Sequence, residues 1–170
     1  MIRRATLQDG DWIRDTAAHV YAALGDYGRV IPGWVAHPGV ATYVETTDDG
    51  TRRGFILLGF YAPWTVSETE RSSIHPGELV ADLLAIAVAP EQQRRGVGKA
   101  LLTYAIDLVR EASVRAPVRE LRLTVADTNR IAQHLFDSFG FEVLDQNHGA
   151  YDGGQRAIRM RLRIHERATS

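Results

Sequence analysis

The chain has 170 residues, of which 45% are hydrophobic and 24% are charged, and its formal net charge at pH 7 is −1. This length and apolar fraction suffice for one complete core, so we expect a single globular domain over residues 1–170. The near-zero net charge provides no general attraction for nucleic acid or for an anionic membrane. The absence of cysteine excludes disulfides, thiolate metal sites and a cysteinyl acyl-enzyme, and we expect no metal.

Two features bear on location. No apolar run approaches the length of a membrane span, and the first ten residues are polar and charged, unlike a secretory signal. A cytoplasmic protein is therefore expected.

The first forty residues predict a short strand over Ile2–Ala5 and a helix that is capped by the segment Thr6-Leu7-Gln8-Asp9 and closed by Gly25. Apolar residues recur along this helix at helical spacing. The aromatic segment Asp26–Gly39 is rich in Gly and Pro, which is typical of a loop or of short broken helices. One interpretation is an ordered connector that places Trp34 in the core.

Two strands, Ala41–Thr46 and Gly54–Tyr61, are predicted to form a hairpin, because the Asp-Gly step between them favours a tight turn. The polar loop Pro63–Gly77 follows and contains His75. This loop either overhangs an active site or is a variable surface loop.

The centre of the chain is a strand followed by a turn and a helix. Residues Leu83–Ala89 are almost all apolar, as in a strand buried on both faces, and Pro90 ends it. The turn Gln93-Arg94-Arg95-Gly96-Val97-Gly98 leads into an amphipathic helix from Val97 to about Ala112. Glycines let a ligand approach the backbone, and the first N–H groups of a helix have no intrahelical partner. With Lys99 nearby, this turn favours a phosphate.

Two other phosphate-binding patterns do not fit the turn. A Walker motif requires Ser or Thr after the lysine, where Ala100 stands. A dinucleotide fingerprint requires a third glycine, where Leu101 stands.

The last fifty residues predict a strand at Leu121–Val125, a helix capped by Asp127, Thr128 or Asn129, and a closing hairpin of Phe141–Leu144 and Ala157–Ile164. In the second hairpin strand, apolar residues alternate with arginines. We expect the arginines to line one solvated face.

Two blocks carry a resemblance to a known family. The turn Gln93–Gly98, preceded by Val88-Ala89-Pro90, resembles the acyl-CoA signature Gln/Arg-x-x-Gly-x-Gly/Ala of the GNAT superfamily of N-acyltransferases. The segment Asn129–Phe141 is similar to the family's Asn-x-x-Ala-x-x-Leu-Tyr-x-x-x-Gly-Phe. The two blocks cover about residues 79–143, which the resemblance implies is the acyl-CoA-binding core.

The order of the predicted elements gives the class α+β/α. The resemblance implies the GNAT fold, with a mixed, mostly antiparallel sheet of about seven strands and about four helices. It also implies that acetyl-CoA is the cosubstrate and that its pantetheine arm enters between two strands that splay apart. For the segment Asp26–Gly39 the family resemblance implies, instead of a connector, that the segment lines the acceptor-substrate cleft. The implied cofactor-binding residues are Ile86, Ala87, Val88, Gln93, Arg94, Arg95, Gly96, Val97, Gly98, Lys99, Asn129 and Phe136.

The catalytic residues are less well marked. Asp82 is the first candidate base, since some relatives present a carboxylate at this position and alternation places it with Leu84, Ile86 and Val88 on an apolar face. It also fits a solvated carboxylate, and Glu78 is the second candidate. Phe136 stands where much of the family has a proton-donating tyrosine. Tyr151 is the candidate substitute.

The resemblance implies direct attack of an amine on the thioester. The acceptor is a small amine or a peptide N-terminus, and the segment Tyr151–Met160 is similar to the ending of ribosomal-protein N-terminal alanine acetyltransferases. Those enzymes usually have a glutamate where Thr124 stands. The alternative is an acyl-CoA-binding sensor that has lost transfer activity. A homodimer is compatible with either interpretation.

Overall fold

A seven-stranded mixed sheet organises the chain in a computed structural model that describes residues 1–62 and 77–164. The strand order is β1-β2-β3-β4-β5-β7-β6, and only β4 and β5 pair in parallel. In chain order the elements are β1 (Ile2–Arg4), α1 (Gly10–Val20), α2 (Tyr27–Ala36), β2 (Val40–Thr46), β3 (Arg52–Tyr61), β4 (Leu79–Val88), α4 (Val97–Arg115), β5 (Val118–Ala126), α5 (Arg130–Ser138), β6 (Glu142–Asp145) and β7 (Ala157–Arg163), with 3-10 turns at Leu7–Asp9 and Pro90–Gln92. The predicted fold class is confirmed.

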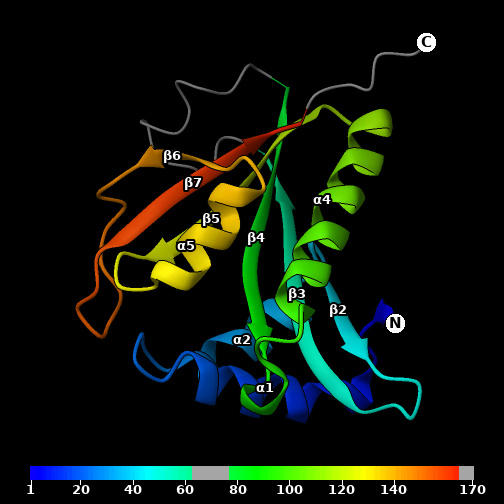
Figure 1. Ribbon diagram of the computed structural model, residues 1–170. Coiled ribbons are helices and arrows are strands. Elements are labelled where there is room, and N and C mark those ends of the chain that lie inside the picture. Colours follow the sequence, from blue (N-terminus) through cyan, green and yellow to red (C-terminus); the bar gives the residue numbers. More distant parts are fainter. Residues whose placement is uncertain (63–76, 165–170) are drawn as a thin grey trace.

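Helices cover both faces of the sheet (Figure 1). On one face, α4 and α5 pack over a core that includes Ile56, Leu101 and Leu121. On the other face, α1 and α2 pack over a smaller core that includes Phe55 and Ile31. Both predicted helices of the acyl-CoA-binding core therefore lie on the same side of the sheet.

The segment Asp26–Gly39 differs from its prediction as a loop or broken helices, because most of it forms the helix α2, with Pro32 inside it. Tertiary packing outweighs the low helix propensity of Pro and Gly here. Ile31 is fully buried and Trp34 packs against the same core, which confirms that Trp34 contributes to the interior. Asp26 caps the helix through a side-chain bond to the N–H of Arg29.

The strands β4 and β5 separate along their length. Their pairing runs from Leu79 opposite Val118 to Leu83 opposite Leu123, whereas β4 continues to Val88 and β5 to Ala126. The expected splay of these two strands is thus confirmed, and it leaves one edge of β4 without a strand partner beyond Leu83.

A β-bulge changes which way the side chains of β4 point. Leu57 lies opposite Ala85 and Leu58 opposite Leu83, so Leu84 is an extra residue in β4. As a result Ile86 and Val88 pack on the α4 side, while Leu84 packs on the α1 side. The prediction that Asp82 shares a face with Ile86 and Val88 was wrong, because simple alternation does not survive the bulge.

The arginines of β7 also differ from their prediction as one solvated face. Arg159 is buried, and the side chain of Arg161 is only 15% exposed. Arg163, at the end of the strand, is exposed as expected. The predicted loop Pro63–Gly77, with His75, lies outside the described residues except for Gly77. Within residues 1–62 and 77–164 no helix is long and apolar enough to span a bilayer.

Candidate active site

The separation of β4 and β5 opens a pocket between them. Its walls are Leu83–Ile86 of β4 and Leu123–Ala126 of β5. The rest of its lining comes from α5 and the segment before it, and from the α1–α2 region and the β6–β7 loop. Those remaining lining residues are Asn129, Ala132 and Phe136, and Tyr21, Leu24, Tyr27 and Tyr151.

The free edge of β4 faces this pocket with its backbone. The hydroxyl of Tyr21 donates to the carbonyl oxygen of Ile86 at 2.7 Å and accepts from the N–H of Ile86 at 3.1 Å. The side-chain amide of Gln93 donates to the carbonyl oxygen of Val88 at 3.3 Å. Because backbone groups alternate along a strand, those of Ala87 point toward β3, where it lies opposite Phe55. Ile86 and Val88 are therefore the positions from which β4 could bind a further strand-like ligand.

The glycine-containing turn has the backbone shape that its sequence predicts. Gly96 precedes α4 with φ 78°, a left-handed conformation that glycine adopts without strain, and Arg94 also has a positive φ of 59°. The N–H groups of Val97, Gly98 and Lys99 open α4 and have no partner within the helix. A side chain at Gly98 would meet Val88 and Leu135 only at ordinary contact distance, so the fold itself does not require glycine there.

The second predicted block lies against the same pocket. The side chain of Asn129 accepts from the N–H of Ala132 at 3.1 Å and so caps α5, which decides among the three predicted caps. Phe136 is 3% exposed, and its ring lies 5.8 Å from that of Phe141. Where the ring of Phe136 meets the pocket, it supplies an apolar surface and no proton.

Three tyrosines, Tyr21, Tyr27 and Tyr151, also line the pocket. The rings of Tyr21 and Tyr27 are 4.9 Å apart, and Tyr151 lines the pocket beside them. Burial raises the pKa of Tyr21, of Tyr27 and of Tyr151 above the ordinary tyrosine value. These phenols therefore remain protonated near neutral pH, where they can donate hydrogen bonds but cannot act as bases.

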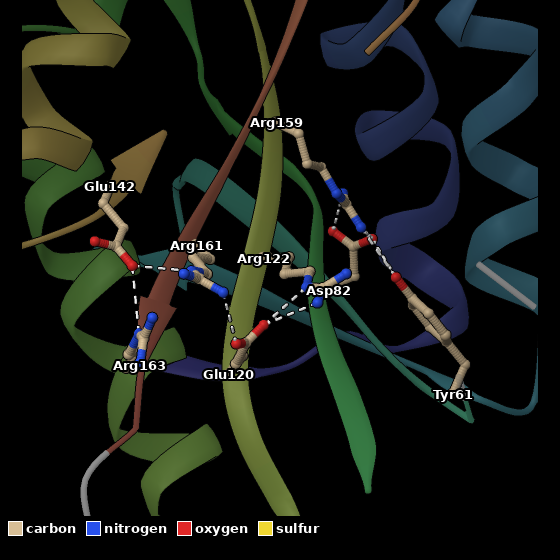
Figure 2. A network of polar contacts seen from close by, with 8 residues as sticks. All are labelled: Tyr61, Asp82, Glu120, Arg122, Glu142, Arg159, Arg161 and Arg163. Carbon is tan, nitrogen blue, oxygen red and sulfur yellow. Dashed lines mark hydrogen bonds and ion pairs between the residues drawn. The ribbon is translucent and has the colours of Figure 1, made fainter. Parts of the chain in front are cut away.

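Asp82 is buried in a polar cluster with Arg159 and Tyr61 (Figure 2). Arg159 donates to its Oδ1 at 3.1 Å and to its Oδ2 at 2.8 Å, and Tyr61 donates to Oδ2 at 2.9 Å. Arg159 also donates to the hydroxyl of Thr124 at 3.1 Å. Thr124 lines the pocket, so the carboxylate of Asp82 is connected to it through Arg159. The role of Asp82 as a base stays a prediction.

Glu78, the second candidate, is not brought to the pocket. It precedes β4, and its carboxylate lies 4.0 Å from Arg119. Leu83, where the pocket begins, is five residue steps further along the extended chain, a distance of about 16 Å. Tyr151, by contrast, does lie at the pocket.

A second polar cluster lies beside the first in Figure 2. Glu120 receives bonds from Arg122 and Arg161, and Glu142 from Arg161 and Arg163. Arg122 is fully buried. These charges are shared among β5, β6 and β7, which explains why Arg161, bonded to both glutamates, is largely withdrawn from solvent.

Comparison of the chain with known protein families identifies one family. A model described as the acetyltransferase (GNAT) family matches residues 9–141, which include both predicted blocks and the strands that form the pocket. The chain belongs to the GNAT family.

Two sequence relatives share part of this GNAT domain. The chain is 38% identical over 87 residues to the alanine N-acetyltransferase of ribosomal protein bS18 from Escherichia coli, which covers 49% of the chain and 56% of that enzyme. It is 37% identical over 87 residues to the mycothiol acetyltransferase of Acidimicrobium ferrooxidans, which covers 51% of the chain and 25% of that enzyme. The chain thus matches only part of the length of each relative.

Solved structures agree on the fold. NAA60 of Arabidopsis thaliana with a bisubstrate analogue superposes with a TM-score of 0.79 at 15% identity, over 98% of each chain. The acetyl-CoA complex of the same protein gives a TM-score of 0.76 at 14% identity, over 96% of this chain and 98% of that one. At these identities the likeness concerns the fold alone.

Sequence reasoning missed Tyr21 and Arg159. Tyr21 has the helical spacing of a core residue, and nothing local marks its bond to Ile86, 65 positions away. Arg159 lies directly opposite Thr124 in the β5–β7 ladder. Knowledge of the strand register would have found it, but composition and periodicity do not supply that register.

Proposed function

We propose that this protein transfers an acetyl group from acetyl-CoA directly to a primary amine. The observation that supports this most strongly is the coincidence of two features on β4 and α4: a strand edge open beyond Leu83 and a helix N-terminus with glycines and basic residues. The pantetheine arm would bind Ile86 and Val88 as an added strand, and its pyrophosphate would accept from the N–H groups of Val97, Gly98 and Lys99. Arg94, Arg95 and Lys99 add positive charge there.

The chemistry needs no covalent enzyme intermediate. The amine nitrogen attacks the thioester carbon, negative charge develops on the acyl oxygen, and the C–S bond then breaks to release the CoA thiolate. A thiol has an ordinary pKa of about 8.5, so the thiolate can leave without a strong acid, which is consistent with Phe136 at the usual tyrosine position.

The pocket favours an acceptor that is neutral at ambient pH. Among the described residues, its lining contains no Asp, Glu, Lys, Arg or His. An α-amino group has a pKa of about 7.7 to 8.0, whereas that of a lysine side chain is about 10.4. At pH 7.5 about a third of the former is neutral but only about 0.1% of the latter. We therefore propose an α-amine, as at a peptide N-terminus, in preference to a polyamine.

Calorimetric titration with acetyl-CoA, CoA and ATP tests the donor site. We expect acetyl-CoA and CoA to bind and ATP not to compete. Gly98→Asp is the matched variant, because an acidic residue suits a helix N-terminus but repels a pyrophosphate. It should fold normally and bind acetyl-CoA at least about tenfold more weakly, a loss of about 1.4 kcal/mol. Failure of the wild-type protein to bind acetyl-CoA would overturn the proposal.

Thiol release from acetyl-CoA tests the acceptor. A panel of short peptides with free N-termini is compared with the same peptides blocked at the N-terminus but carrying a lysine, and with spermidine. We expect release with the free N-termini. Thiol release with spermidine alone would contradict an α-amine as the acceptor. Tight binding of acetyl-CoA without thiol release for any member of the panel would favour the acyl-CoA-binding sensor.

A further inference from the structure

Thr124 lies where the two strands begin to separate. It follows Leu123, the last residue of β5 paired with β4, and its half-buried side chain lines the pocket. Its side chain points to the sheet face opposite α4, since Leu123 and Val125 on either side pack in the α4 core. An acyl group carried along β4 to the end of the gap would arrive beside it.

The hydroxyl oxygen of Thr124 already accepts one hydrogen bond from the protein. It accepts from Nη1 of Arg159 at 3.1 Å. A guanidinium has only donors, so the hydroxyl hydrogen cannot point at Arg159 and must point elsewhere. Within residues 1–62 and 77–164, no hydrogen bond donated by this hydroxyl is formed. The hydroxyl is thus oriented as a donor, and the pocket is the space that it borders.

Arg159 is held rigidly enough to impose this orientation. Its side chain is 6% exposed, and both nitrogens of its fork contact the carboxylate of Asp82. Tyr61 accepts from Nη2 at 3.0 Å while donating to Asp82, which closes the cluster. Figure 2 shows Asp82, Arg159 and Tyr61 directed toward one another from three different strands. The carboxylate is thus directed at Arg159, and Arg159 in turn bonds to Thr124 on the pocket wall.

We propose that Thr124 is a catalytic residue that donates a hydrogen bond to the acyl oxygen, and that Asp82 and Arg159 are positioning residues for it. The proposal rests on the proposed acetyl transfer. As nitrogen forms its bond to the carbonyl carbon, the π electron pair moves to the oxygen, where the Thr124 hydroxyl meets it. The pair returns as the C–S bond breaks, sulfur leaves as the thiolate, and the ammonium proton passes to sulfur or to water.

Thr124→Val and Thr124→Ser form the matched pair for the test. Valine keeps the shape and removes the hydroxyl, whereas serine keeps the hydroxyl. With the best acceptor of the panel, Thr124→Val should lower kcat about a hundredfold, the scale of one lost oxyanion donor, with acetyl-CoA affinity unchanged. Thr124→Ser should stay within a few-fold of the wild-type kcat. Unfolding curves confirm that both variants fold.

Asp82→Asn separates positioning from direct base catalysis. If Asp82 only positions, the variant lowers kcat but keeps the shape of the pH–rate profile, and its effect nearly disappears in the Thr124→Val background. A flattened acid limb, or a full additional loss in that background, would overturn the positioning role.

Other outcomes decide the rest. If Thr124→Val keeps the wild-type kcat, the proposed hydrogen bond from Thr124 to the acyl oxygen is overturned. The same holds if the variant raises only the KM for the acceptor. Wild-type thiol release is measured first, so that failure of the acetyl-transfer proposal is recognised before any variant is compared.

Discussion

Two buried carboxylates in this molecule are built alike but lie in different places. Asp9 accepts from both Nη atoms of Arg3, from Arg52 at 2.7 Å, and from the backbone and hydroxyl of Thr6. Asp82 accepts from both Nη atoms of Arg159 and from Tyr61. In each case a carboxylate is held by a guanidinium and a hydroxyl.

The difference lies in where the contacts end. Those of Asp9 join β1, the first turn and β3, and none of its partners lines the pocket. Those of Asp82 end at Thr124, on the pocket wall. We therefore expect the Asp9 cluster to stabilise the fold alone. We expect the Asp82 cluster to position side chains of the active site as well. Breaking each in turn tests this division.

The largest effect should follow Asp82→Ala. The side chain of Arg159 is 6% exposed, so Asp82→Ala breaks a buried ion pair, at a cost of about 3–5 kcal/mol in the free energy of unfolding. Urea unfolding measures it. A double variant in which Asp82 and Arg159 are both leucine should recover much of this stability, yet remain poor in thiol release. Recovery of both properties would contradict a role in the site.

Asp9→Asn should cost less, about 1–3 kcal/mol. The side chains of Arg3 and Arg52 are 34% and 31% exposed, so each can be solvated when the charge is lost. Because the cluster is remote from the pocket, kcat for thiol release should equal that of the wild type. This variant thus controls for instability alone in the Asp82 experiments, and a drop in its kcat would erase the distinction between the two clusters.

The stability due to Asp9 should also depend on pH. The bonds from Arg3 hold the pKa of the Asp9 carboxyl well below its ordinary value of about 3.9. A lowered folded-state pKa contributes stability that is fully present above the unfolded-state pKa and is lost as the pH falls through the folded one. The difference in unfolding free energy between wild type and Asp9→Asn should therefore be constant from pH 7 to pH 5 and shrink below pH 4. Urea titrations at a series of pH values measure this difference. A difference that grows as the pH falls would contradict a lowered pKa for Asp9.

Features formed by neighbouring residues could be predicted from the sequence, whereas contacts between distant strands could not. The donor turn Gln93–Gly98 and the cap of α5 are local features whose backbone geometry follows from nearby residues, and both were predicted. The Asp82 cluster joins three strands, with 77 positions between Asp82 and Arg159. No local pattern encodes that contact, and the bulge at Leu84 reverses the alternation that would have placed Asp82. The helix α2 was missed for a similar reason, because its stability comes from burying Ile31.

The smallest effect concerns the donor side, at Tyr21. Its hydroxyl satisfies both backbone groups of Ile86, the groups that the pantetheine arm is proposed to bind. Tyr21→Phe removes those bonds from the unliganded protein, at a cost of about 1–3 kcal/mol, but the ligand replaces them in the complex. The melting temperature should fall by a few degrees.

The same substitution should tighten acetyl-CoA binding, by up to about tenfold, because the complex loses less than the free protein does. Tyr27→Phe is the matched control, since its ring contacts Tyr21 but among the described residues its hydroxyl forms no hydrogen bond. It should leave the melting temperature unchanged, because no hydrogen bond between described residues is lost. Weaker binding in Tyr21→Phe would mean that the hydroxyl stays in place and contacts the ligand. Tyr21 would then bind the pantetheine arm with its side chain, beside the backbone groups that β4 supplies at Ile86 and Val88.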